Sequence, residues 1–224
     1  MKYYDNSKMK KLSNQQVAEI LAEYSITVAG ESPLIEGIQA YAALLLQWNR
    51  SISLTTVTDP EDVIRFHFGE SLFAASCVPI TGGRLADVGT GAGFPGLPLK
   101  MLISSLDLTL IESNAKKASF LAEVVRRLGL ERVHIFRGRI EEFRGGLDLI
   151  SPAPFDVITA RAFGQFDSLL AWAKGHLARS GRVALWLGQE DATSISQTAG
   201  WSWEAPKQIP GSERRFIVSG SPRD

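Results

Sequence analysis

The feature that most constrains this chain is a glycine-rich stretch, which reads Leu-Ala-Asp-Val-Gly-Thr-Gly-Ala-Gly-Phe-Pro-Gly over Leu85–Gly96. Its apolar start, Leu85–Val88, is too short for a helix and lies between turn residues, so we predict a buried strand there. The loop predicted to follow contains three glycines, which can adopt positive φ and let a ligand approach the backbone: Gly89, Gly91 and Gly93. Pro95 suits the first turn of a helix after the loop. A strand, a glycine loop and a helix in this order are typical of a nucleotide-type cofactor site.

Two classes of cofactor compete for the predicted loop. The spacing Gly91-x-Gly93-x-x-Gly96 satisfies the dinucleotide fingerprint, which on its own is a weak signal and leaves an NAD-dependent dehydrogenase as an alternative. The same residues with Asp87 in front, Asp87-x-Gly89-x-Gly91-x-Gly93, resemble the first motif of methyltransferases that use S-adenosylmethionine. A carboxylate here attracts an ammonium group and repels a pyrophosphate, so the acid favours S-adenosylmethionine.

A second strand supports a cofactor site. Asp107–Ile111 is compatible with a strand and ends at Glu112, about 20 residues beyond the glycine loop. An acid at that spacing commonly binds ribose hydroxyls. The alternative is a solvated acid at the end of a strand, which becomes the weaker interpretation once the glycine loop is considered with it.

The order of the remaining elements indicates the fold class. Residues 1–80 carry helical patterns and predict an N-terminal helical extension, whereas strand and helix patterns alternate over residues 81–224. This alternation predicts an α/β core with a mostly parallel sheet flanked by helices, a Rossmann-like arrangement. Beyond the two strands already named, the sequence predicts three more at 132–136, 155–160 and 182–187, a helix at 166–177, and irregular structure with a last strand pair in the tail.

Composition limits the classes of partner and compartment. The chain has 24 basic and 24 acidic residues, so nucleic-acid binding would need a local basic patch. Cys77 is the single cysteine and excludes an intramolecular disulfide, and the three histidines are scattered without the spacing of metal ligands. With no apolar run long enough to span a membrane and no signal-peptide pattern at the N-terminus, we expect a cytoplasmic protein without a metal, and a monomer.

Across nearly its whole length the chain resembles the bacterial family of small-subunit ribosomal RNA guanine-N7 methyltransferases, the glucose-inhibited division protein B (RsmG) family. The segments that carry the resemblance are Leu54-Thr55, His67-x-x-Glu70-Ser71, the stretch from Asp87 to Gly96, Arg139-x-Glu141-Glu142, Arg161-Ala162-Phe163, Gly188-Gln189 and Glu213-Arg214. The resemblance implies a class I S-adenosylmethionine-dependent methyltransferase fold. Its specific part is the glycine loop with Phe94-Pro95-Gly96 behind it.

The resemblance also implies roles for individual residues. It places Gly89 and Phe94 against the cofactor, Glu112 at the ribose, Ile140 and Glu141 beside the adenine, and Arg161 at the site from the fourth strand. With the motif residues added, the expected cofactor-binding set is Asp87, Gly89, Gly91, Gly93, Phe94, Glu112, Ile140, Glu141 and Arg161. The candidates for substrate contact are His67, Arg139 and Arg214.

The chain departs from the family pattern at three positions that bear on substrate contact. Glu70 stands where the family has aspartate, Leu187 where a lysine is common, and Ala160 where a serine often precedes the arginine. The loss of a lysine and a hydroxyl group leaves open a non-catalytic RNA-binding or assembly protein on a methyltransferase fold.

The implied reaction needs positioning more than proton transfer. Guanine N7 carries an unprotonated lone pair, so in-line methyl transfer to it requires no general base, and alignment can supply about 7 to 11 kcal/mol of the barrier. The implied partner is 16S ribosomal RNA within a small ribosomal subunit or its precursor. A local surplus of basic residues could contact it, formed by Lys116, Lys117, Arg126, Arg127, Arg132, Arg137, Arg139 and Arg144, with Arg214 and Arg215 as possible additions.

Overall fold

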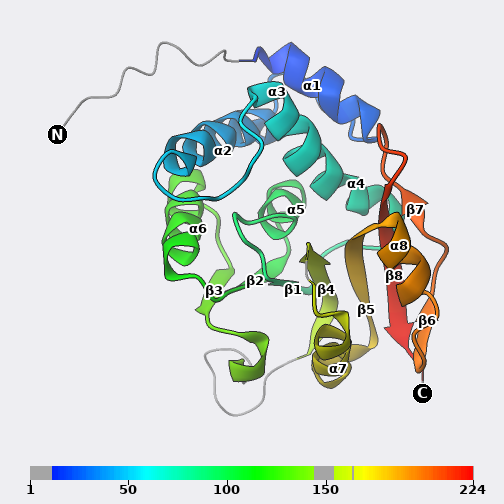
Figure 1. The fold of residues 1–224 in the computed structure, drawn as a ribbon. Coiled ribbons are helices and arrows are strands. Elements are labelled where there is room, and N and C mark those ends of the chain that lie inside the picture. Colours follow the sequence, from blue (N-terminus) through cyan, green and yellow to red (C-terminus); the bar gives the residue numbers. More distant parts are fainter. Residues whose placement is uncertain (1–11, 144–153, 163, 224) are drawn as a thin grey trace.

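A mixed sheet organises the protein. The structure, a computed structural model, describes residues 12–143, 154–162 and 164–223. In that part of the chain eight strands form one sheet in the order β3-β2-β1-β4-β5-β8-β6, and β7 pairs with β8 (Figure 1). The strands are β1 (Arg84–Val88), β2 (Asp107–Glu112), β3 (Val133–Arg137), β4 (Phe155–Arg161), β5 (Leu177–Gly188), β6 (Trp201–Trp203), β7 (Lys207–Gln208) and β8 (Arg215–Pro222).

The first five strands are parallel, and β8 runs antiparallel to β5. The sequence runs outward from β1 to β2 and β3, then returns to the other side of β1 with β4 and β5. Strand order therefore reverses between β1 and β4, and in open α/β sheets ligands bind beyond the carboxyl ends of the strands at such a point. The predicted fold class is confirmed.

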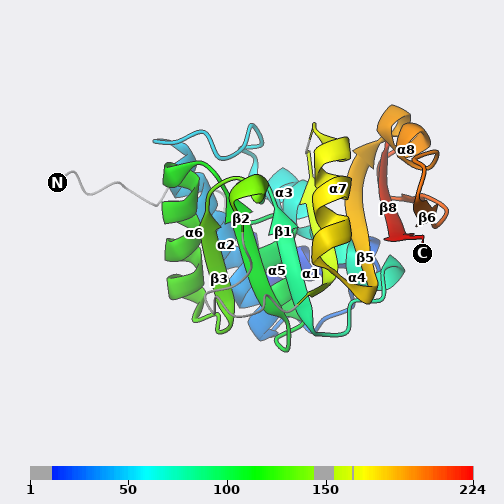
Figure 2. The same cartoon turned by 90° about the horizontal axis from the view of Figure 1, so that it is seen from below.

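Helices cover both faces of the sheet (Figures 1 and 2). One face packs against the N-terminal helices and against α5 and α6, through alternate strand residues such as Leu85 and Leu108. The opposite face, including Ala86 and Val88, packs with α7 and α8. The helices are α1 (Asn14–Glu23), α2 (Pro33–Asn49), α3 (Pro60–Val63), the π-helix η2 (Ile64–Gly69), α4 (Glu70–Cys77), α5 (Gly96–Leu102), α6 (Ala115–Leu128), the 3-10 helix η3 (Ile140–Glu142), α7 (Phe166–His176) and α8 (Gln189–Ile195).

The starts of the N-terminal helices follow their sequence signals. Ser13 and Gln16 form a capping box at the start of α1, Ser32 caps α2, and the Asp59 carboxylate accepts from two backbone N–H groups at the start of α3. No helix in the described ranges is long and apolar enough to cross a membrane. One apolar cluster joins these helices to the sheet, so the extension and the core share buried surface.

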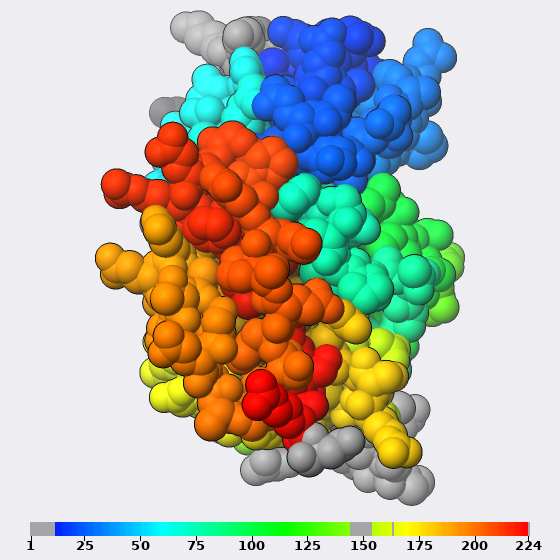
Figure 3. All heavy atoms as spheres, turned by 90° about the vertical axis from the view of Figure 1, so that its right-hand side faces the viewer, coloured from blue at the N-terminus to red at the C-terminus, as the bar shows by residue number. Residues whose placement is uncertain are grey.

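The C-terminal third differs from the prediction in three places. Strand β5 begins at Leu177, directly after α7, because backbone pairing with β4 continues past an irregularity near Phe155. Helix α8 was not predicted, since its sequence is mostly polar and only Ala192 and Ile195 are buried. The tail forms β6, β7 and β8, and Figure 3 shows this orange-to-red segment against the blue and teal N-terminal helices. Residues 1–11, and Arg144 and Phe163, lie outside the described residues.

Candidate functional site

The three glycines of the loop after β1 have different structural roles. Gly91 has φ of 60°, and a Cβ atom built on it would meet nothing nearer than the Gly89 carbonyl oxygen at 3.9 Å, so this position faces open space. Gly93 has φ of 93°, and its Cβ would lie 2.2 Å from the Tyr41 hydroxyl. Gly89, with φ of 63°, donates its N–H to the Ile111 carbonyl at 2.9 Å and joins the loop to β2. The loop therefore packs tightly at Gly93 and leaves an open cradle at Gly91.

Asp87 lies beneath the loop and is fully buried. Its Oδ1 accepts a hydrogen bond from the Thr159 hydroxyl at 2.8 Å, and its Oδ2 accepts from the Gly96 N–H at 2.9 Å and from the Thr90 hydroxyl. Burial raises the pKa of Asp87 to about 6, although these hydrogen bonds and Arg161 act in the opposite direction. The carboxylate thus connects β1 to β4 and to the start of α5.

Glu112 ends β2 on the other side of the loop and is 7% exposed. Its Oε2 accepts from the Gly91 N–H at 2.9 Å, and its Oε1 accepts from the Asn114 N–H at 2.7 Å. Each carboxylate oxygen retains a further lone pair. The acid predicted from strand spacing is therefore in direct contact with the open part of the glycine loop, in a position suited to accept hydrogen bonds from hydroxyl groups.

A stack of three rings packs at the Phe94 end of the glycine loop. The Phe94 ring lies between Tyr41 from α2, with ring centroids 5.3 Å apart, and His67 from η2, at 4.8 Å. The Tyr41 hydroxyl donates to the Ala92 carbonyl of the loop, and burial raises the pKa of Tyr41 well above its usual value. His67 Nε2 lies 2.7 Å from the Thr55 hydroxyl, and burial, with the nearby Arg161 charge, lowers the pKa of His67 to about 4. His67 is therefore a neutral imidazole at pH 7.

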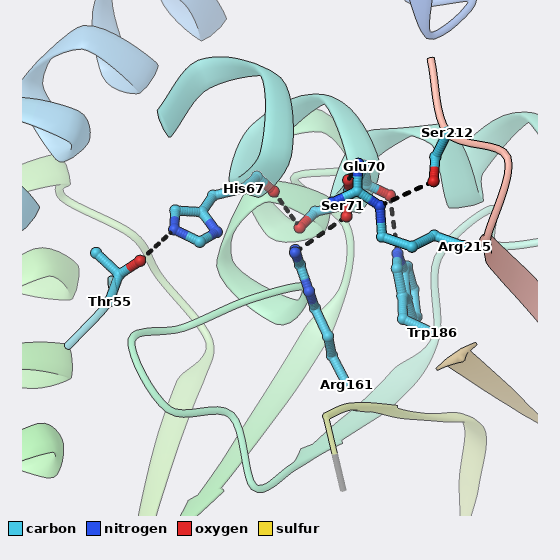
Figure 4. Close-up of polar contacts among 8 residues, drawn as sticks. All are labelled: Thr55, His67, Glu70, Ser71, Arg161, Trp186, Ser212 and Arg215. Carbon is cyan, nitrogen blue, oxygen red and sulfur yellow. Dashed lines mark hydrogen bonds and ion pairs between the residues drawn. The ribbon is translucent and has the colours of Figure 1, made fainter. Parts of the chain in front are cut away.

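Beside this stack, one buried carboxylate joins three distant segments (Figure 4). Glu70 from α4 is 1% exposed and lies 3.0 Å from Nη2 of Arg161 at the end of β4 and 3.0 Å from Nη2 of Arg215 at the start of β8. Burial raises the pKa of Glu70, although both arginines lower it. The Trp186 indole N–H donates to the Glu70 carbonyl at 2.9 Å. We call Glu70, Arg161 and Arg215 the charge triad.

The other predicted site residues lie near the carboxyl-terminal edge of the sheet, and they differ in burial. Ile140 is buried in the apolar cluster that contains Val88 and Ile111, and Glu141 is exposed beside it. Arg139 is exposed after β3. Arg214 is exposed just before β8, which pairs with the carboxyl end of β5. Both arginines are thus at the same edge of the sheet but on strands far apart in it, and only His67 among the three substrate candidates lies against the loop.

Several side chains at the site were not predicted from the sequence. Tyr41 has the spacing of an ordinary core residue, and Arg215 was assigned to a possible RNA surface rather than to a buried acid. In the segment His67-x-x-Glu70-Ser71, the burial of Glu70 and Ser71 was not predicted either. No group of three or more residues able to hold a metal ion occurs among the residues that the structure describes.

Comparison with known proteins identifies the family of this arrangement. Residues 34–207 match the family model GidB, described as rRNA small subunit methyltransferase G. The chain is 37% identical over 168 residues to the ribosomal RNA small subunit methyltransferase G of Desulfitobacterium hafniense, covering 75% of this chain and 69% of the relative. It is 36% identical over 206 residues to the protein of that name from Xanthomonas axonopodis pv. citri, covering 88% and 90%.

A solved structure supports the fold independently of sequence. The ribosomal protein L11 methylase of Lactobacillus delbrueckii subsp. bulgaricus superposes with a TM-score of 0.59 over 71% of this chain and 80% of its own, at 14% identity. At that identity the match bears on the fold alone.

Proposed function

The chain belongs to the rRNA small subunit methyltransferase G (GidB) family, an S-adenosylmethionine-dependent methyltransferase family, and we propose that it methylates N7 of a guanine in 16S ribosomal RNA. The observation that carries the proposal is the contact between Glu112 and the open glycine at Gly91, at the strand-order reversal of the sheet. An acid at the end of β2 and a loop with space above it fit a cofactor that contains a ribose. The buried acid Asp87 favours S-adenosylmethionine over a pyrophosphate-containing dinucleotide.

We assign the cofactor contacts to the residues that surround the open part of the loop. When bound, S-adenosylmethionine supplies a methyl group on a positively charged sulfur. The residues proposed to hold it are Asp87, acting through the loop, with Gly89, Gly91, Gly93, Phe94, Glu112, Ile140, Glu141 and Arg161. Buried Phe94 excludes water from one side, and Glu112 accepts hydrogen bonds.

The proposed reaction needs no general base at the site. Guanine N7 is an unprotonated nucleophile, so the protein has to align it and exclude water, which can supply about 7 to 11 kcal/mol of the barrier. His67 is the nearest titratable imidazole, and its low pKa means that no proton has to leave it at neutral pH. We propose that His67, Arg139 and Arg214 contact the RNA, with the basic residues of α6 and β3 as further phosphate contacts.

We propose that the substrate is a small ribosomal subunit or its precursor, and that the protein acts as a cytoplasmic monomer. The balanced charge of the chain supports a preformed particle, because a protein without a net positive charge gains little from the phosphates of naked RNA. Comparable methylation of naked 16S RNA and of the assembled particle would contradict this part of the proposal.

The deciding experiment measures transfer of labelled methyl from S-adenosylmethionine to small subunits from a strain without their own guanine-N7 methylation. The expected product is one N7-methylguanine, absent with a Gly89→Asp variant that places a carboxylate in the loop. Cofactor binding without any label in RNA would favour a non-catalytic RNA-binding or assembly protein, and binding of NAD in place of S-adenosylmethionine would favour the dehydrogenase alternative.

A further inference from the structure

A cavity lies at the carboxyl ends of β4 and β5. It has a volume of about 510 Å³, within the range of sites that hold a small ligand. Its walls include the apolar side chains of Phe166, Trp186, Leu187 and Ile209, and Gly188 lies at its margin. Its polar part is the charge triad together with Asp191.

The cavity lies near the glycine loop, but residues of the loop do not line it. None of Gly89, Gly91, Gly93 or Glu112 lines it. Arg161 connects the two, because it lines the cavity while its charge acts on both Asp87 and His67. Strand β4 lies between β1, which carries the loop, and β5, which carries Trp186 and Leu187. The cavity is therefore one strand away from the predicted cofactor position.

Two buried polar atoms of the triad have unused hydrogen-bonding capacity. Among the residues that the structure describes, Nη1 of Arg161 has no hydrogen-bond partner, and neither has Oε1 of Glu70, which only forms the ion pair with Arg215. A buried donor or acceptor left without a hydrogen bond costs about 1 to 3 kcal/mol. A ligand that offered an acceptor beside a donor would satisfy both atoms.

Guanine has this combination of groups and adenine has the reverse. Guanine carries the O6 acceptor next to the N1–H donor, whereas adenine has an amino donor at that position beside an unprotonated N1. A guanidinium group paired with a carboxylate matches O6 and N1–H. A flat base also fits walls made of Phe166 and Trp186.

We propose that this cavity receives the target guanine, unstacked from the RNA, and that Arg161 and Glu70 recognise its O6 and N1–H. This inference rests on the proposed function, since it names the pocket in which that reaction's base would lie. Enzymes that modify a nucleobase commonly extrude it from its stack into a pocket of this kind. The base lies here beside the loop, and Arg161, which is also proposed to contact the cofactor, lies between the two.

Gly188 allows a test that fills the cavity without disturbing the backbone. Its φ is −72°, and a Cβ atom built on it meets nothing within 4 Å. We expect Gly188→Trp to lower methyl transfer at least about 100-fold, the scale of a misplaced substrate, with affinity for S-adenosylmethionine unchanged. Gly175→Trp is the matched control, because Gly175 is exposed on α7, also has open space, and does not line the cavity.

The results separate this inference from the proposed function. If the wild-type protein transfers no methyl group to any RNA, the proposed function fails first. If it does, Gly188→Trp with normal transfer overturns the cavity assignment, and so does Gly188→Trp that loses cofactor affinity, because the cavity would then belong to the cofactor. If thermal unfolding shows that Gly188→Trp is not folded, Gly164→Trp replaces it, since Gly164 lines the same cavity with open space.

Base analogues test the recognition itself. Once the methylated nucleotide is mapped, small subunits are reconstituted with inosine or 2-aminopurine at that position. Inosine keeps O6 and N1–H and should retain transfer, whereas 2-aminopurine keeps N7 but lacks both groups and should lose it. Equal transfer to the two analogues would contradict recognition by Arg161 and Glu70.

Discussion

Two glycines of the same loop should respond differently to substitution by alanine. Gly91 and Gly93 both have positive φ, 60° and 93°, so each alanine variant pays the conformational penalty of that region. They differ in surroundings, because the added methyl group meets open space at position 91 but at position 93 approaches the Tyr41 hydroxyl and, at 2.5 Å, the Leu97 side chain. Position 91 therefore tests ligand approach, and position 93 tests packing.

The magnitudes follow from these two terms. Gly91→Ala should lower the free energy of unfolding by about 1 to 2 kcal/mol, the cost of a left-handed backbone for a residue with Cβ. Gly93→Ala adds about 1 to 3 kcal/mol for overpacking, for a sum of about 2 to 5 kcal/mol. The second variant should also weaken the hydrogen bond from Tyr41 to the Ala92 carbonyl, which lies next to the crowded atom.

Urea unfolding and calorimetric titration of S-adenosylmethionine measure the two effects separately. Gly91→Ala should bind the cofactor at least about 10-fold more weakly, the equivalent of 1.4 kcal/mol, and should lose only about 1 to 2 kcal/mol of stability. Gly93→Ala should unfold at clearly lower urea. A Gly91→Ala variant with wild-type cofactor affinity would refute the assignment of the open cradle, and equal destabilisation by both variants would refute the packing argument.

Three further predictions concern the charged and titratable groups. Because the pKa of His67 is lowered to about 4, its contribution to stability is present above pH 6.5 and is lost as the pH falls towards 4. The free energy of unfolding should fall by about 3 kcal/mol over this range. Urea unfolding at a series of pH values should show this decrease, and His67→Gln should remove it. The pKa of Asp87 is raised to about 6, so its contribution to stability has the opposite pH dependence: it is full below pH 3.8 and is lost as the pH rises through 6. A carbon NMR titration of this carboxyl group should give a midpoint near pH 6. A midpoint near pH 4 would contradict the effect of its burial. In the charge triad, Arg161→Gln should cost about 3 kcal/mol of stability, whereas Arg215→Gln should cost under about 1 kcal/mol, because the Arg215 side chain is 40% exposed; comparable losses in thermal unfolding would contradict this ranking.

The sequence predicted the parts of the fold whose signals are local. Strand ends at Val88 and Glu112 depend on neighbouring residues, and the structure has them where they were predicted. The helix caps Ser13 and Asn114, and Gly129, which ends α6 with φ of 60°, are local signals of the same kind. Helix α8 was missed, because a short polar helix with two buried residues has almost no apolar periodicity.

The sequence predicted the site residues that lie on consecutive elements of the chain. It did not predict the contacts between elements that are far apart in the sequence. The glycine loop and Glu112 come from consecutive strands, so their spacing indicates their proximity. The contact between Tyr41 and Ala92 crosses 51 positions of the chain, and that between Trp186 and Glu70 crosses 116. No local pattern encodes such pairings, which depend on tertiary packing of an amphipathic helix or strand against the sheet.

The charge triad explains why the helical extension is energetically part of the core. Arg161 ends a central strand, and its ion-pair partner, Glu70, comes from the extension. Without Glu70, a largely buried guanidinium group would lose its counter-charge, a change that costs about 3 to 5 kcal/mol in proteins. The extension also supplies Tyr41 and His67 to the ring stack around Phe94, and the same apolar cluster contains residues of both parts. We infer that the boundary near residue 81, although visible in the sequence pattern, divides one cooperative unit, because the carboxyl edge of β4 is complete only with α4 packed against it.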